Sequence, residues 1–426
     1  MSDPLDYGYE VTIASPATSS PPASSITNQW QRKNEGTTEY YDIPGATNET
    51  YEVGANDRAA DIQLVQDVDG IKVSSNFLEV TSEPFEIQTP GFGNRSGNEK
   101  WAGGVLAPNG KIYCIPYNSR EILIIDPETN TTEVFGDFAG SKKWVGGALA
   151  PNGKIYGIPH SSTKFLEIDP DAKTASLVGS TLNGSLKWAG GSLAANGKIY
   201  GIPHYDQQVI EFDPETYAIS RFGSLGGSDK WWSGVVGTDG HIYGVPFGSA
   251  STAVLEINPD NKSVRTWGSA GGAQKWRAGA LDFLGEIFMV PYAQNYALEV
   301  NTTTQKLTTF GSLSGAYKWA GTVVSPSGKI YGIPYNSTSI LEVIPETNQV
   351  RTFGSISGNA KFLGGVLAKN GKIYCVPYNS FSILVIDTGW TESVPDHQWT
   401  DNDPYFDLPG CPNDKLSILS PYFNKF

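Results

Sequence analysis

The stretch Lys100-Trp-Ala-Gly-Gly-Val-Leu-Ala-Pro-Asn-Gly-Lys-Ile-Tyr-Cys-Ile-Pro-Tyr117 decides the fold, because it recurs along the chain. In each copy an aromatic residue follows the lysine, another aromatic comes twelve residues later, and a proline comes three residues after that. The first aromatics are Trp101, Trp144, Trp188, Trp231, Trp276, Trp319 and Phe362. Seven copies in one register cannot be chance, and a period of about 40–45 residues is typical of repeat folds.

One copy divides into four short strands. The sequence predicts strands at 103–107, 112–116, 122–125 and 132–135. Asn109-Gly110 between the first two is a strong hairpin signal, and a proline at the end of the second cannot donate to a sheet. The copy leaves no room for a helix. Four antiparallel strands repeated seven times predict an all-β fold with a seven-bladed β-propeller.

The ends of the repeat predict how the ring closes. Most copies end on an aromatic residue followed by glycine, as in Phe135-Gly136, but the seventh copy has no such ending. The pair Phe92-Gly93 stands ahead of the first copy instead. We therefore expect residues 86–93 to supply the outer strand of the last blade, within a propeller of residues 86–389. That pairing removes an open sheet edge.

The flanking segments differ from the repeat. Residues 1–85 contain Trp-Gln-Arg from Trp30, then Gly-Ala-Thr and Thr-Tyr-Glu-Val, within short β-like runs. These motifs resemble small immunoglobulin-like modules of phage and bacterial surface proteins, which implies a β-sandwich with Trp30 in its core. The stretch 15–25, rich in proline and serine, departs from that pattern. Residues 390–426 form a tail rich in aromatic residues, which we expect to pack on the propeller or on another subunit.

Composition and charge make several classes of function unexpected for this chain. The 426 residues carry a net charge of −14, and only 17% of them are charged. A nucleic-acid partner is not expected, because phosphate binding needs a basic surface. The chain has no apolar run long enough for a membrane span and no standard secretory signal at its start. Three cysteines form no disulfide framework, and we expect neither a cofactor nor a metal.

Two features repeat near one face of the predicted propeller, and each has two interpretations. The first is a lysine before each first aromatic. These lysines are a candidate cationic ring for a sulfated or carboxylated glycan, or they bind loop carbonyls while their stems pack on tryptophan. They are Lys100, Lys143, Lys187, Lys230, Lys275, Lys318 and Lys361.

The second feature is an aromatic or histidine ring directly after the proline of each copy, which is followed in three copies by asparagine. Aromatic rings and amides bind the faces and hydroxyls of sugars, but a shared turn could require the same residues. The candidates are Tyr117, Asn118, His160, His204, Tyr292, Tyr335, Asn336, Tyr378 and Asn379, with Phe247 in the same position. His160 and His204 are also a candidate acid/base or metal pair, similar to the histidines of streptogramin lyases, or they replace tyrosine.

The repeat resembles a propeller family of marine protists and of viruses or phages with marine hosts. Together with the immunoglobulin-like module, this resemblance implies a virion-associated structural or fibre protein, located on the particle and not an enzyme. Its expected partners are other virion proteins or copies of itself, and its propeller face is expected to bind host-surface glycans. The alternatives are a scaffold or decoration protein without a ligand and a propeller lyase or hydrolase.

Overall fold

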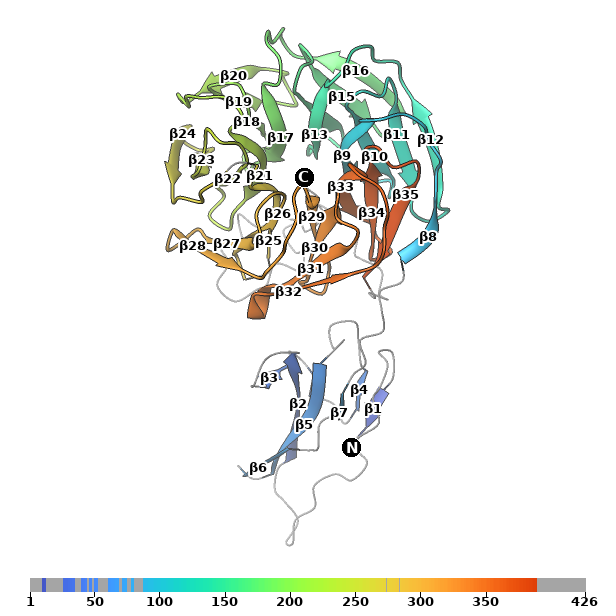
Figure 1. Cartoon of the computed structure of the whole chain (residues 1–426), viewed down its shortest axis with the longest axis vertical. Coiled ribbons are helices and arrows are strands. Elements are labelled where there is room, and N and C mark those ends of the chain that lie inside the picture. The colour runs from blue at the N-terminus through green and yellow to red at the C-terminus, as the bar shows by residue number, and fades with distance from the viewer. Residues whose placement is uncertain are drawn as a thin grey trace. The chain divides into compact units, whose positions relative to one another are not determined.

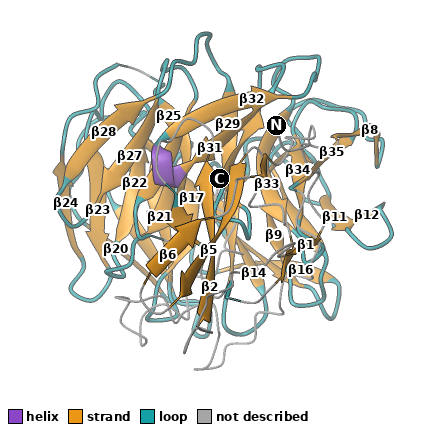
Figure 2. Ribbon diagram, turned by 90° about the horizontal axis from the view of Figure 1, so that it is seen from below, coloured by secondary structure: helices purple, strands orange, loops and turns teal. Residues whose placement is uncertain are grey.

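The computed structural model describes residues 10–12, 26–34, 40–43, 46–47, 50–52, 60–68, 71–74, 78–79, 87–272, 274–282 and 284–388. The chain divides into two compact units, one of residues 1–85 with 388–391 and one of residues 86–387 with 392–426. Apart from the short 3-10 helix η2 (Pro345–Thr347), the described elements are strands (Figure 2). The all-β prediction is confirmed. None of the helices in the described ranges is long and apolar enough to cross a membrane.

The described residues of the first unit form one five-stranded sheet and one strand pair. The sheet has the order β3–β2–β5–β6, with β7 also pairing β5, and β1 pairs β4. The strands are β1 (Glu10–Thr12), β2 (Ile26–Asn34), β3 (Tyr41–Asp42), β4 (Thr50–Glu52), β5 (Ala60–Val68), β6 (Ile71–Ser74) and β7 (Leu78–Glu79). Trp30 on β2 is buried with Ile62 and Leu64 of β5, as expected of a core tryptophan. The predicted loop 15–25 and the tail 390–426 lie outside the described residues.

The second unit contains seven four-stranded antiparallel sheets among its described residues (Figure 1). The first three sheets are β9 (Trp101–Leu106), β10 (Ile112–Pro116), β11 (Ile122–Asp126), β12 (Thr131–Phe135); β13 (Trp144–Leu149), β14 (Ile155–Pro159), β15 (Phe165–Asp169), β16 (Thr174–Val178); and β17 (Trp188–Leu193), β18 (Ile199–Pro203), β19 (Val209–Phe212), β20 (Ile219–Phe222). The next three are β21 (Trp231–Val236), β22 (Ile242–Pro246), β23 (Val254–Asn258), β24 (Ser263–Trp267); β25 (Trp276–Leu281), β26 (Ile287–Pro291), β27 (Ala297–Asn301), β28 (Lys306–Phe310); and β29 (Trp319–Val324), β30 (Ile330–Pro334), β31 (Ile340–Ile344), β32 (Gln349–Phe353). The last is β33 (Phe362–Leu367), β34 (Lys372–Pro377), β35 (Ile383–Asp387) and β8 (Ile87–Phe92).

The sheets form a closed ring. The first strand of each sheet contacts the first strand of the next, and β33 contacts β9 (Figure 1). Hydrophobic side chains fill the space between neighbouring sheets, and the repeated tryptophan lies in that layer. Trp101, for example, packs in one cluster with Val376 and Ile383 of the last sheet. This is the arrangement of a β-propeller, and the propeller prediction is confirmed at that level.

The last sheet takes its fourth strand, β8, from the N-terminal end of the described propeller residues. β8 pairs β35 with Phe92 opposite Ile383 and Ile87 opposite Ile386. A Cβ atom at Gly91 would lie 2.0 Å from the carbonyl oxygen of Ile383, so only glycine fits at this close approach. Phe92 packs against the neighbouring core, with its ring edge-to-face with Tyr374 at 6.3 Å.

Candidate functional site

The seven rings that follow the prolines form a closed circle where the sheets meet, which we call the axial ring. The second strand of each sheet ends at a proline, and the residue after that proline turns toward the centre of the circle. The axial ring consists of Tyr117, His160, His204, Phe247, Tyr292, Tyr335 and Tyr378. Their neighbouring centroids lie 5.5 to 6.1 Å apart around the whole circle. The structure thus brings together residues that the sequence placed only at equivalent positions.

Backbone hydrogen bonds join the axial ring to the loop lysines. The N–H of Lys143 donates to the carbonyl oxygen of Tyr117 in the preceding sheet, and the N–H of Tyr117 donates to the carbonyl of Lys100 in its own sheet. The pattern repeats around the circle, including the closure from Lys100 to Tyr378. Each sheet is therefore tied to the next by a bond between their loops.

The seven loop lysines are buried, each at most 4% exposed. The ammonium of Lys143 donates to the carbonyl oxygens of Tyr117, Ser119 and Gly140 at 3.0, 2.7 and 3.0 Å. Lys230 binds three carbonyl groups in the same way. An ammonium has three donors, so these are fully used. Each of the other five lysines binds at least two carbonyl groups. The candidate ring of Lys100, Lys143, Lys187, Lys230, Lys275, Lys318 and Lys361 is therefore buried against loop carbonyls, and these side chains hold the loops together.

Burial lowers the pKa of Lys143 from 10.5 to about 8, so the group still carries its charge at pH 7. The charged form suits its place, because carbonyl oxygens surround it. Its stem lies beside the neighbouring indole, with the ammonium 5.9 Å from the Trp144 ring. Of the two interpretations of these lysines, the contacts agree with the second, in which the ammonium binds loop carbonyls while the side-chain stem packs on tryptophan.

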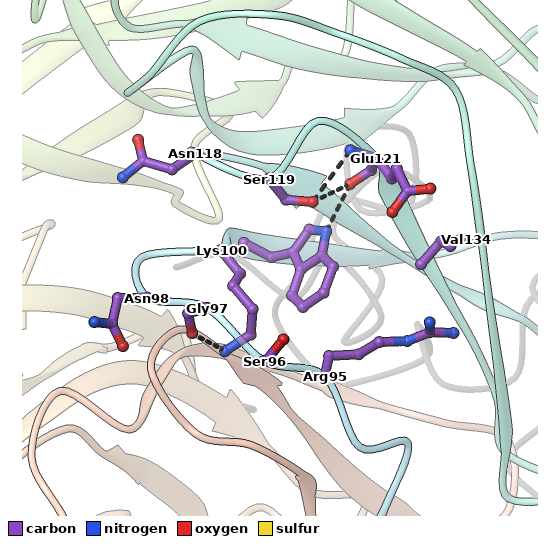
Figure 3. A pocket seen from close by; sticks show the side chains of 10 residues that line it. Arg95, Ser96, Gly97, Asn98, Lys100, Asn118, Ser119, Glu121 and Val134 are labelled. Carbon is purple, nitrogen blue, oxygen red and sulfur yellow. Dashed lines mark hydrogen bonds between the residues drawn. The ribbon is translucent and has the colours of Figure 1, made fainter.

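The same arrangement is visible at a surface pocket of about 350 Å³ between the loops of the first sheet and the segment before it (Figure 3). The Lys100 ammonium turns onto the carbonyl of Gly97 at 2.9 Å (Figure 3). The indole N–H of Trp101 donates to the carbonyl of Glu121 at 2.8 Å. Both groups are thus committed to the protein backbone, although they line the pocket.

The predicted asparagines have backbone partners. The side-chain oxygens of Asn118, Asn336 and Asn379 accept from the N–H groups of Lys142, Ala360 and Glu99 at 2.8, 2.7 and 2.7 Å. Those three residues have left-handed backbone, with φ of 53°, 47° and 51°. Left-handed backbone is costly for residues other than glycine, so the amides stabilise a strained turn. Their oxygens are occupied in this role and do not face a ligand.

His160 and His204 stack at 5.7 Å, and both are buried. Nδ1 of His160 lies 2.8 Å from the carbonyl of Trp188, and Nε2 of His204 lies 3.6 Å from Oδ1 of Asp229. Burial lowers the pKa of His160 to about 4, which keeps this ring neutral at pH 7. Within the described ranges, no group of three or more His, Cys, Asp or Glu residues could hold a metal ion.

Acid is expected to destabilise the propeller through His160. Between its unfolded pKa of 6.5 and its folded pKa of about 4, the unfolded chain binds a proton that the folded chain does not. Stability therefore falls as the pH falls through this window, by about 2 kcal/mol at pH 5. His160→Phe, which copies Phe247, should remove this part of the loss in urea titrations at pH 7.5 and pH 5.

His241→Lys is the matched control, because lysine stands at this hairpin position in five other copies. It should keep the acid sensitivity of the wild type. Equal sensitivity in His160→Phe and the wild type would show that burial does not control this histidine.

Trp232 and Arg277 depart from the repeat, and the sequence alone assigns them no role. Both directly follow the repeated tryptophan, where the other copies have alanine, valine or leucine. The Arg277 guanidinium lies 4.1 Å from the Trp232 ring. Tyr205 and Tyr317 were missed because each occurs in one copy only. They contact His204 and Tyr292 of the axial ring at 4.8 and 5.2 Å and are 42% and 41% exposed.

No family model matches the chain, and no curated protein matches it. Among solved structures, it is similar to a streptogramin B lyase, with 13% identity, a TM-score of 0.60 and coverage of 71% of this chain and 97% of that one. It is also similar to virginiamycin B lyase from Staphylococcus aureus, at 11% identity and a TM-score of 0.61, over 71% and 98% of the two chains. A third similar structure is hydrazine synthase from Kuenenia stuttgartiensis, with 13% identity and a TM-score of 0.54, over 70% of this chain and 99% of that one. The likeness shows the propeller fold. At these identities it carries no activity to this chain.

Proposed function

We propose that this protein is a non-enzymatic structural or fibre protein of a virus particle, and that its propeller displays a glycan-binding face. The observation that carries the binding proposal is the axial ring with Tyr205 and Tyr317 beside it. These two tyrosines are exposed although each packs against a ring of the buried circle. Exposed, supported aromatic side chains offer flat faces for stacking on sugars, and their hydroxyls remain free to bond.

The proposed location on a virus particle rests on the resemblance of the N-terminal motifs to phage modules. We also propose two details of the fold, an immunoglobulin-like sandwich and seven propeller blades. The sheet around buried Trp30 supports an immunoglobulin-like sandwich. Seven four-stranded sheets in a closed ring support seven blades. In this proposal the N-terminal unit or the tail attaches to other virion proteins or to copies of this chain, while the propeller face is left free. Mass spectrometry of purified particles would detect the chain if this is correct.

A glycan array of neutral and acidic oligosaccharides tests the binding function. The wild type should bind, and Tyr205→Ala combined with Tyr317→Ala should weaken binding at least about tenfold, because both stacking faces are lost. Tyr41→Ala is the matched control, since Tyr41 is 53% exposed but belongs to the first unit. This control should bind like the wild type.

Other outcomes point to the alternatives. A wild-type protein that is retained on particles but binds no glycan would contradict the proposal and favour a scaffold. Metal-dependent turnover of a ligand, lost in His160→Ala or His204→Ala, would favour a propeller lyase or hydrolase.

A further inference from the structure

The axis of the propeller carries a positive charge where the repeat normally places a small apolar side chain. Six copies have Ala102, Val145, Ala189, Trp232, Ala320 or Leu363 at the position of Arg277. Five of these are aliphatic and belong, with Trp232, to the apolar cluster at the axial ring. Arg277 is only 6% exposed. A leucine would fill this position without burying a charge, so filling space does not explain the arginine.

Aromatic faces surround the Arg277 guanidinium. Its central carbon lies 4.1 Å from the ring of Trp232, 5.0 Å from Tyr292, 5.3 Å from Tyr335 and 5.8 Å from Phe247. Each such contact stabilises a cation by roughly 0.5–2 kcal/mol, but none neutralises it. Among the described residues, no carboxylate lies within 4.0 Å of this guanidinium.

The nearby phenols do not supply the missing negative charge. Burial raises the pKa of Tyr117 and of Tyr292 to about 12, so both hydroxyls stay protonated at neutral pH. The Tyr292 hydroxyl accepts from Nη1 of Arg277 at 3.3 Å, which is a long bond. The guanidinium therefore remains a net cation in a largely apolar setting.

Two buried N–H groups at this place have no acceptor in the protein. They are Nε of Arg277 and Nε1 of Trp232, on side chains that stack on each other. The repeated tryptophans, in contrast, donate, for example Trp231 to the carbonyl of Ala253 at 2.9 Å. Buried donors without partners are rare in folded proteins, and each costs about 1–3 kcal/mol. Unpaired donors beside an unneutralised cation are the features of an anion site.

Two carboxylates beside residues of the axial ring have other partners. Oε2 of Glu99 accepts from the side chain of Asn118 at 3.0 Å, and Oδ1 of Asp229 lies 3.6 Å from Nε2 of His204. Neither forms an ion pair with Arg277. The buried Arg277 guanidinium therefore has no carboxylate partner among the described residues, and a negative group brought by a ligand would supply one.

We infer that Arg277 and Trp232 form a binding site for a carboxylate at the centre of the axial ring. This inference deepens the proposed function, and the sugar part of the ligand rests on that function. The ligand would be an acidic sugar, such as a uronic acid, whose ring stacks on the tyrosines while its carboxylate binds Arg277. Planar guanidinium and carboxylate groups match in geometry. The charge comes from one side chain specific to the fifth sheet, and not from the sevenfold lysines.

Calorimetry of the full chain with D-glucuronate, D-glucose and acetate at low salt tests this site. The wild type should bind glucuronate at least about tenfold more tightly than glucose. Arg277→Leu copies Leu363, and Arg277→Ala copies Ala102, so both variants should fold. Both should bind glucuronate no better than glucose. Arg120→Ala is the control for net charge, because Arg120 is exposed and pairs only with Asp137 at the surface. It should keep the preference of the wild type.

The failures can be told apart. If the wild type binds glucuronate and glucose equally and Arg277→Leu changes neither, the carboxylate site is wrong while glycan binding stands. If acetate binds the wild type but not Arg277→Leu, and no sugar binds, the anion site stands and the glycan proposal fails. If no ligand binds the wild type, both are wrong.

Discussion

Deleting residues 86–93 is expected to leave the propeller insoluble, or to lower its melting temperature by about 8 °C or more, the shift that ~5 kcal/mol produces in a domain of this size. The deletion removes β8, which is the fourth strand of the last sheet. Strand β35 would keep β34 but lose its partner on the other edge, and the core around Tyr374 would lose Phe92. An unpaired strand at an edge is also a site of aggregation. Solubility and a thermal melt measure the effect.

A point substitution tests the same strand without shortening the chain. Gly91→Val should act in the same direction, because its Cβ would meet the carbonyl oxygen of Ile383. Gly226→Val is the control, since nothing lies within 4 Å of a Cβ at Gly226. A soluble deletion variant that melts like the wild type would refute the role of β8 in closing the ring.

Replacing one buried lysine with methionine is expected to cost at least about 4.5 kcal/mol of unfolding free energy, since three charged hydrogen bonds contribute roughly 1.5–3 kcal/mol each. Lys143→Met keeps the stem beside Trp144 but removes all three bonds to carbonyl oxygens. Those oxygens would then lie unsatisfied in the loops that join two sheets. Urea unfolding measures the loss.

The adjacent residue provides the control. Lys142 is exposed, and its contact with Asn118 is made by its backbone N–H, which Lys142→Met retains. This variant should stay within about 0.5 kcal/mol of the wild type, as is usual for surface substitutions. If both variants lose the same stability, the buried ammonium does not tie the sheets together.

The strands could be predicted because every signal repeats. The prediction of 112–116 coincides with β10, and the predicted strand 103–107 begins two residues late, since β9 starts at Trp101. The prediction begins the strand at the paired glycines, whereas Trp101 already pairs with Pro116 of β10 across a register shift. Turn glycines, prolines and strand-forming residues recur in one register, so a wrong assignment in one copy would be corrected by the others.

The candidate site was harder to predict from the same repeats. Periodicity placed Lys143 and Tyr117 on one face, but it does not show whether an ammonium faces water or carbonyl oxygens. That depends on how the loop of one sheet folds over the next, which is a contact between different copies. Arg277 and Trp232 were visible as departures at one repeat position. Their contact follows from two neighbouring copies carrying large side chains at equivalent places around a circle.

The position of β8 has a consequence for the order of folding. β8 leaves the ribosome before the other described strands of the propeller, and its partner β35 is the last of them to be made. This pair therefore joins residues almost 300 positions apart, and such contacts form slowly. The earlier sheets can pair locally as they emerge. Until Asp387 has been synthesised, however, the ring has one incomplete sheet and an open seam. We expect refolding to show a slow final phase that Gly91→Val delays, because closing the ring is the last step that the chain can take.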